Sequence, residues 1–238
     1  MNQIKKKIKE IAWFPAGFYH ALNIAYNNIV RFYNRTNFGY IGKNTILEYP
    51  ITITNPKNVY LSEHTKIRRG LFIINDTGKF VLKKYSAIAI NCTIITGNHT
   101  PTVGIPHIIL GSSHINDKET DIIVEEEVWI GANCTLLSNT HIGRGAIIGA
   151  CSLVNKEIPP YAVAVGSPAK IIASVFTIEE IIAHEKQIYT ETERFSYEYL
   201  SQLFEKYFKD KKSIGVSQIS AEDELKIDMK KKIMGIDY

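Results

Sequence analysis

The chain repeats itself every six residues between Val124 and Pro159, and this repeat limits the fold more than any other feature. Read in sixes, the stretch is VEEEVW, IGANCT, LLSNTH, IGRGAI, IGACSL and VNKEIP. Every first position is aliphatic, and most fifth positions are small or β-branched. A period of six fits neither an α-helix nor a strand that alternates between two faces. Since one such unit cannot bury its own apolar side, the repeat predicts a solenoid of stacked units.

Three units would close one triangular coil, and successive coils would pair as parallel strands about 4.8 Å apart. The repeat then places Val124 over Ile142 and Ile130 over Ile148 in the interior. Small fifth-position side chains would fit the narrow interior, and glycines would relieve the backbone at the corners. Weaker copies of the pattern begin at Ile41, Leu61, Leu82 and Ile88. We therefore expect an all-β solenoid domain over residues 39–175.

Two flanking segments have helical patterns in place of the six-residue one. Residues 1–38 are basic and rich in aromatic residues, with apolar positions at helical spacing. Thr177 and Glu180 have the spacing of a capping box, which predicts a helical region to about residue 209 in one or two pieces. A linker over 213–220 and a short charged helix over 221–234 complete the expected C-terminal extension, residues 176–238.

Charge and cysteine content argue against two classes of protein. The net charge is +4, but residues 1–40 carry six basic side chains and one acidic one, so the rest sums to −1. A general nucleic-acid surface is therefore not expected. The three cysteines, Cys92, Cys134 and Cys151, include no CxxC pair. We expect them to be structural and expect no disulfide scaffold.

The N-terminal segment leaves two interpretations open. No apolar run is long enough to span a bilayer, and the start lacks a signal-peptide layout, so a cytoplasmic location is expected. In one interpretation, this helical segment covers the open end of the solenoid. In the other, residues 1–37 make a peripheral contact with an anionic membrane surface, at the inner face of the cell membrane.

The repeat is interrupted once on a large scale, between Ile95 and Ile123. The intervening loop, residues 96–122, contains several glycines and prolines and is polar near its end. A loop longer than about 15 residues inside a compact domain is usually functional or disordered. His99 lies where this loop begins. His107 and His114 match no motif, and we expect them at the surface or on the acceptor side.

Four elements of the sequence resemble the hexapeptide-repeat acyltransferases: the tandem sixes, TGNH at 96–99, VWIG at 128–131 and IPPYAVAVGSPAK at 158–170. The resemblance covers roughly residues 40–173. It is strongest to galactoside, maltose and polysaccharide O-acetyltransferases, and next to xenobiotic acetyltransferases. It implies a left-handed parallel β-helix that forms a homotrimer, with active sites between subunits. It also implies acetyl-CoA as co-substrate, with no metal required.

The resemblance assigns the general base to His99. A sugar hydroxyl is a weak nucleophile at neutral pH, and an imidazole, which ordinarily titrates near neutral pH, takes its proton during attack on the thioester. The histidine then returns that proton to the leaving CoA sulfur, so no acyl-enzyme is needed. Considered alone, the same residue is equally an exposed loop histidine.

The resemblance also assigns residues to acetyl-CoA. Trp129 would lie along the pantetheine arm and thioester, although it could equally pack against a neighbouring subunit. The backbone N–H groups of Ala132 and Ala150 would bind the acyl-CoA, with Ala132 as the oxyanion donor. Lys156 and Lys170 are candidates for the CoA phosphates, with solvated surface lysines as the alternative.

Residues for the acceptor are suggested only by position. Asn75, Asp76 and Thr77 lie in a gap between the sixes that could face the same cleft, where Asp76 could orient His99 or bind a sugar hydroxyl. Turn chemistry explains the same residues. Arg69 stands where galactoside-acting relatives have an amide, which favours a different and anionic acceptor.

The sequence therefore predicts transfer of an acetyl group from acetyl-CoA to a hydroxyl of a sugar, surface glycan or polysaccharide. N-acetylation of an amino sugar and acetylation of a xenobiotic are the nearest alternatives. A zinc enzyme resembling the γ-type carbonic anhydrases, and a non-catalytic solenoid, are the alternatives from other classes. The former needs three converging histidines, and the spacing of this chain shows no histidine pair of that kind.

Overall fold

The computed structural model describes Leu22 and residues 35–236. The chain divides into two compact units, Met1–Asn34 and Arg35–Tyr238, and strands β1 to β17 and helices α3 to α6 all lie in the second. Of the predicted N-terminal segment 1–38, residues 35–37 form a short 3₁₀ helix, η1 (Arg35–Asn37), followed by the buried Phe38. The rest of that prediction, including the membrane contact through residues 1–37, lies outside the described residues apart from Leu22. Among the helices that the structure describes, none has both the length and the apolar character needed to cross a bilayer.

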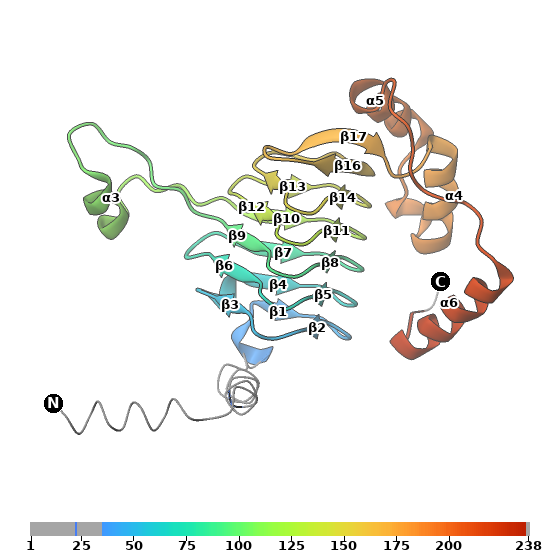
Figure 1. The fold of residues 1–238 in the computed structure, drawn as a ribbon, viewed down its shortest axis with the longest axis horizontal. Helices are drawn as coiled ribbons and strands as arrows, with labels where there is room; N and C mark the ends of the chain where they lie inside the picture. The colour runs from blue at the N-terminus through green and yellow to red at the C-terminus, as the bar shows by residue number, and fades with distance from the viewer. Residues whose placement is uncertain (1–21, 23–34, 237–238) are drawn as a thin grey trace, which may run out of the picture. The chain divides into compact units, whose positions relative to one another are not determined.

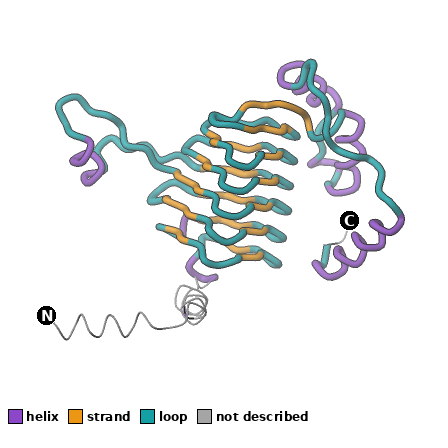
Figure 2. The backbone as a smooth tube through the Cα atoms, in the orientation of Figure 1, coloured by secondary structure: helices purple, strands orange, loops and turns teal. Residues whose placement is uncertain are grey.

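The body of the second unit is a stack of three-sided coils, each of which adds one strand to each of three sheets (Figures 1 and 2). One sheet has the order β1 (Tyr40–Ile41), β4 (Val59–Leu61), β7 (Phe80–Leu82), β10 (Ile122–Val124), β13 (His141–Ile142). The second contains β2 (Ile46–Leu47), β5 (Lys66–Ile67), β8 (Ala87–Ile88), β11 (Trp129–Ile130) and β14 (Ile147–Ile148), and ends with β16 (Ala162–Val165) and β17 (Lys170–Ser174). The third contains β3 (Thr52–Ile53), β6 (Phe72–Ile74), β9 (Thr93–Ile95), β12 (Thr135–Leu136) and β15 (Leu153–Val154). We call these sheets A, B and C.

The register of the sheets confirms the six-residue prediction. Val124 pairs with Ile142 in sheet A, and Ile130 pairs with Ile148 in sheet B. These four first-position side chains are all 0% exposed. The fifth positions are buried as well: Val128, Cys134, Thr140, Ala146, Ser152 and Ile158. Each apolar side chain therefore packs against its counterpart one coil away, which is how short strands of two or three residues become a continuous core.

Gly145, with φ of 67°, relieves the backbone at a corner as predicted, but the second-position glycines have a different role. The left-handed backbone falls on fourth positions, where φ is 58° at Glu127 and 57° at Asn133. The second-position glycines are needed because adjacent coils approach closely. A Cβ added at Gly131 would lie 2.5 Å from the backbone nitrogen of Ala150. The second position is therefore limited by contact between coils, not by backbone conformation.

The last coil ends in an antiparallel pair. Strands β16 and β17 run in opposite directions, and the turn between them contains Gly166, with φ of 98°. This reversal was not predicted. It covers one end of the coil stack (Figure 1), where the solenoid needs a cap.

The C-terminal extension contains α4 (Ile178–Ile188), the 3₁₀ helix η3 (Glu191–Glu193), α5 (Tyr197–Tyr207) and α6 (Ala221–Met234). The capping box at Thr177 and Glu180 is present as predicted. Buried Glu185 of α4 joins the helices to the coils, because it lies 3.2 Å from Arg144 and accepts a hydrogen bond from Tyr161 at 3.0 Å. Desolvation, followed by the charge of Glu185, raises the pKa of Tyr161. Arg144 stacks on the ring of Tyr189 at 4.1 Å, so α4 and its C-cap are fixed to the coil wall.

Candidate active site

The loop, residues 96–121 in the structure, leaves the coils between β9 of sheet C and β10 of sheet A and carries the short helix α3 (His107–Ser113) (Figure 1). Its two ends meet at its base, where the N–H of Thr120 donates to the carbonyl of Thr96 at 3.1 Å. The loop is therefore a hairpin-like excursion whose start and finish are held together between two successive coils.

Glu119 anchors the returning end of the loop to the coil below. Its carboxylate accepts hydrogen bonds from three successive backbone N–H groups, those of Asp76, Thr77 and Gly78, and from the hydroxyl of Thr96. Burial alone would raise the pKa of this carboxyl, but the hydrogen bonds from Gly78, Thr96 and Thr77 outweigh it and lower the pKa. The 76–78 turn and the loop base thus form one rigid unit.

His99 lies on the outgoing side of the loop and contacts a carboxylate from the returning side. Its Nδ1 is 3.0 and 3.1 Å from the two carboxylate oxygens of Asp117. Nδ1 of His114 is 3.0 Å from the same carboxylate. The side chain of Asp117 is only 15% exposed, whereas those of His99 and His114 are 52% and 60% exposed.

This contact fixes which nitrogen of His99 is free to react. A carboxylate beside Nδ1 favours the tautomer with the proton on Nδ1, which leaves Nε2 unprotonated and able to accept a proton. Partial burial acts to raise the pKa of Asp117, but its hydrogen bonds with His99 and His114 lower it overall. Asp117 is therefore an anion at neutral pH.

Glycine at position 111 leaves space in front of the imidazole edge. A Cβ added at Gly111 of α3 would lie 3.7 Å from Nε2 of His99. Any larger side chain there would therefore extend toward the nitrogen that accepts the proton. The loop thus provides a base and a partner that orients it, with Gly111 beside the nitrogen that accepts the proton.

The residues suggested for the acceptor differ in their positions and contacts in the structure. Asn75 is fully buried, and its amide both accepts from the N–H of Asn55 and donates to its carbonyl. These bonds give it a structural role between coils. Asp76 lies beside the loop base and binds Glu119 through its backbone N–H. The carboxylate beside His99 belongs to Asp117, where the sequence had suggested Asp76. Arg69 is exposed between β5 and β6.

The residues assigned to acetyl-CoA lie on the coils and the final hairpin. Trp129 of β11 is 59% exposed on the outer face of sheet B, between Ala87 and Ile147 in register. Ala132 and Ala150 follow at the next corner of successive coils. Among the hydrogen bonds of the described residues, none uses the N–H of either alanine. Lys156 and Lys170 are exposed, and no ion pair within residues 35–236 involves them.

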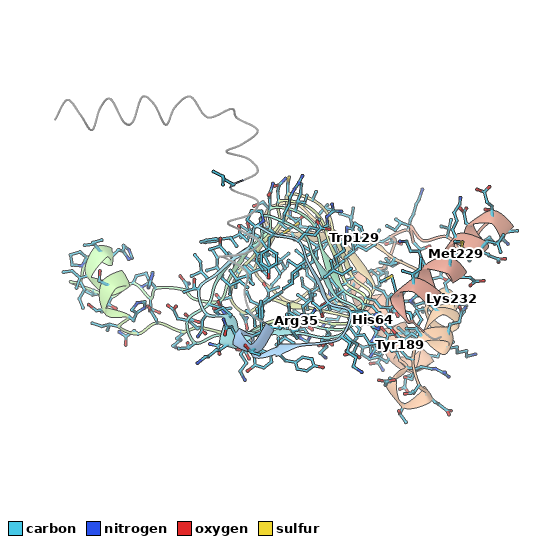
Figure 3. The ribbon with its side chains drawn as sticks, turned by 90° about the horizontal axis from the view of Figure 1, so that it is seen from below. Arg35, His64, Trp129, Tyr189, Met229 and Lys232 are labelled. Atoms are coloured by element: carbon cyan, nitrogen blue, oxygen red, sulfur yellow. The ribbon has the colours of Figure 1, made fainter. Side chains whose placement is uncertain are left out.

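A single chain does not bring all these residues together. The loop leaves at the corner between sheets C and A, and sheet B is the side of the triangle opposite that corner. Figure 3, which looks along the coil stack, shows α3 and Trp129 on different sides of it. His99 and Trp129 therefore face different regions of solvent in one chain.

Sequence reasoning missed Asp117, Glu119 and the role of His114. The spacing of His114 and Asp117, three residues apart, was a weak signal of a local contact. Contact between Asp117 and His99 depends on how the loop folds back, which no repeat pattern encodes. Cys92 and Cys134 are buried, as the structural interpretation expected, and Cys151 is exposed.

Comparison with known proteins identifies the class of this coil stack. Residues 121–156 match the family model described as bacterial transferase hexapeptide (six repeats). The galactoside O-acetyltransferase of Lactococcus lactis is 32% identical over 135 residues, which cover 56% of this chain and 62% of that protein. The first curated relatives are thus matched over less than two thirds of their own length.

Solved structures agree with the repeat. A maltose O-acetyltransferase from Clostridium difficile 630 superposes with a TM-score of 0.55 at 26% identity, covering 67% of this chain and 86% of that one. A hexapeptide-repeat acetyltransferase from Vibrio cholerae O1 biovar eltor, complexed with acetyl coenzyme A, has a TM-score of 0.54 at 23% identity, covering 60% and 74%. Residues 121–156 therefore carry the hexapeptide repeat. It is similar to the galactoside and maltose O-acetyltransferases, and this confirms the resemblance that the sequence motifs indicated.

Proposed function

We propose that this protein transfers an acetyl group from acetyl-CoA to a hydroxyl of a sugar or glycan, with His99 as the general base. The observation that carries the proposal is the contact between Nδ1 of His99 and Asp117 in the long loop of a hexapeptide-repeat fold. Similarity to O-acetyltransferases and to a structure that contains acetyl coenzyme A supports the reaction and the co-substrate.

In this proposal the coils wind in the left-handed sense, as in the hexapeptide-repeat acyltransferases, and three copies assemble into a trimer. The position of the loop opposite sheet B supports an active site between subunits. His99 of one copy would then meet Trp129 of another, with Trp129 lying along the pantetheine arm. Exposure of that ring at 59% is explained if a neighbouring copy and the co-substrate cover it.

The reaction follows from the tautomer of His99. Nε2 accepts the acceptor hydroxyl proton while the hydroxyl oxygen attacks the thioester carbonyl carbon, and the carbonyl becomes an oxyanion. The free N–H of Ala132 stabilises that oxyanion, a contribution of about 3 kcal/mol in comparable sites. The intermediate then expels the CoA sulfur, which takes the proton back from Nε2. Asp117 keeps the proton of Nδ1 in place throughout.

Lysines 156 and 170 would bind the CoA phosphates, because both ammonium groups are exposed and have no carboxylate partner in the described part of the chain. Ala150 would add a second amide to the acyl-CoA. Within this assignment, residues 39–175 form the catalytic unit and residues 176–238 an extension fixed to it. Acetyl-CoA, and hence the protein, would be in the cytoplasm.

The test is a transfer assay that measures release of free CoA from acetyl-CoA with a panel of acceptors: galactosides, maltose, amino sugars and chloramphenicol. We expect release with a hydroxyl acceptor, and loss of roughly 10²–10⁴-fold in rate for His99→Ala. His107→Ala, an exposed histidine in the same loop, is the matched control and should keep the wild-type rate. A His99→Ala protein that transfers at the rate of His107→Ala would overturn the assignment. Transfer to amino groups alone would replace O-acetylation with N-acetylation.

A further inference from the structure

The loop brings three metal-binding side chains together. His99, His114 and Asp117 each offer one ligand atom, and these three atoms lie within 4.8 Å of one another. Among the residues that the structure describes, this is the one group of three or more histidine, cysteine or carboxylate side chains close enough to hold an ion. No sequence motif of this chain had predicted a metal.

The spacing of these atoms suits a small tetrahedral cation. Zinc bonds to histidine nitrogen and carboxylate oxygen are about 2.0–2.2 Å long, so ligand atoms of one site are roughly 3.3 Å apart. The carboxylate of Asp117 is 3.0 Å from each Nδ1. Both distances from the carboxylate to an imidazole nitrogen are therefore within a few tenths of an ångström of that spacing. A donor set of two imidazoles and one carboxylate also favours zinc over magnesium or calcium.

The site is accessible and needs no second subunit. All three ligands come from residues 99–117 of one loop, whose two ends are already joined at the base. Both rings are more than half exposed, so an ion can enter from solvent, while the less exposed Asp117 provides the charge. Three ligands leave the fourth tetrahedral position for water.

We propose that His99, His114 and Asp117 form a binding site for a divalent transition metal of the zinc class, and that the bound metal switches off His99 as a base. The second half of this proposal rests on the proposed function. A metal on Nδ1 of a neutral imidazole takes the lone pair that a proton occupied, so the remaining ring proton must be on Nε2. Nε2 is then a donor and cannot accept the hydroxyl proton. His114 adds the ligand that turns an orienting pair into an ion site.

Direct binding tests the site without reference to acyl transfer. Cobalt(II) is titrated into metal-stripped full-length protein and followed by its visible absorption, and zinc is then added to displace it. We expect saturation near one ion per subunit. His114→Ala should weaken metal binding by about 10- to 100-fold or more. At known metal sites, loss of a residue that only hydrogen-bonds to a ligand already has that effect. His107→Ala, in the same loop but outside the cluster, should bind as the wild type does. Binding that His114→Ala leaves unchanged, or no saturable binding, would overturn the site.

Inhibition tests the switch. Each protein is assayed for CoA release with and without zinc, and its rate is compared with its own rate in chelator. We expect zinc to inhibit the wild type and His107→Ala at concentrations that saturate the cobalt site, and chelator to restore the rate. His114→Ala should need at least tenfold more zinc for the same fractional inhibition. If zinc-saturated wild-type protein transfers acetyl at the rate it has in chelator, the switch is refuted. Absence of transfer in every protein would refute the proposed function and, with it, the switch, while the binding result would still decide the site.

Discussion

Asp117 lies against His99, with its carboxylate oxygens 3.0 and 3.1 Å from Nδ1 of the imidazole. These residues are eighteen positions apart and meet because the loop folds back on itself. The contact matters because a histidine acts as a base at one nitrogen only when the other holds the proton. The chemistry assigned to His99 therefore depends on a neighbour that belongs to no motif.

Replacing Asp117 by Asn tests this dependence. The Asn amide can donate to Nδ1, which favours the tautomer with the proton on Nε2 and blocks the base. We expect kcat to fall on the order of 10²–10⁴-fold, as when a histidine base is held in the wrong tautomer, while the Kd for acetyl-CoA stays unchanged. The assay is run in chelator, so that no metal effect contributes. Asp117→Glu should recover part of the rate. If Asp117→Asn keeps the wild-type kcat, His99 does not depend on this carboxylate.

The space beside His99 makes a second prediction. Leucine at position 111 would project from the Cβ site 3.7 Å from Nε2 of His99 and fill the region where an acceptor hydroxyl must approach. For Gly111→Leu we expect kcat/KM for the acceptor to fall at least about tenfold through steric exclusion, with acetyl-CoA binding unchanged. Ser113→Leu adds the same side chain at an exposed position of α3 and should have little effect. Equal kinetics for the two variants would show that the acceptor approaches from elsewhere.

Glu119 should control the order of the loop base. Glu119→Gln keeps the shape of the side chain but removes the charge that accepts hydrogen bonds from Asp76, Thr77 and Gly78. Hydrogen bonds to a charged group contribute about 1.5–3 kcal/mol each. We expect amide hydrogen exchange at residues 76–78 and 120 to accelerate at least tenfold, with little change in exchange at the coil core. Unchanged exchange at residues 76–78 would show that Glu119 does not hold the turn.

The same carboxylate predicts a pH dependence. The pKa of Glu119 in the folded protein is lower than the ordinary value of 4.5. Its stabilising contribution is therefore complete above that ordinary value and is lost as pH falls through the lowered, folded-state pKa. Proteolysis of the loop by an acid-active protease should accelerate over this acidic interval in the wild type. Glu119→Gln, which has no proton to gain, should lack that acceleration, and an identical pH profile for both proteins would contradict the account.

The close contact between coils at Gly131 predicts that one added methyl group there lowers the stability of the protein. Alanine at position 131 would place its Cβ 2.5 Å from the nitrogen of Ala150 and 2.9 Å from the carbonyl oxygen of Ile148. Backbone atoms cannot move aside as a flexible side chain does, so Gly131→Ala should lower the free energy of unfolding by about 1–3 kcal/mol. Gly111→Ala meets only ordinary contacts and should be neutral or slightly stabilising, because alanine favours a helix. Urea unfolding of both variants measures the difference, and equal midpoints would contradict it.

The sequence was most informative where the chain repeats. The pairing of Val124 with Ile142 and of Ile130 with Ile148 could be predicted from the period alone, because each unit must pack on an identical one. Helix α6 was likewise predicted, as a short charged helix over 221–234. Both are local or nearest-neighbour features, which a single sequence encodes directly.

The site was less predictable because it is not periodic. His99 could be found from the motif at the start of the loop, but Asp117, His114 and Glu119 meet it or its base only after the loop folds. Asn75 was proposed for the acceptor, yet its buried amide binds the backbone of Asn55. Which polar side chains face a site and which satisfy the backbone of the next coil depends on the packing of neighbouring coils.

Calorimetric titration of acetyl-CoA into the purified full-length protein tests the proposed acetyltransferase without any knowledge of the acceptor. We expect saturable binding near one site per subunit, retained in His99→Ala and weakened by the double substitution of Lys156 and Lys170 by Ala. A protein that folds and shows no saturable acetyl-CoA binding would contradict the proposed acetyltransferase.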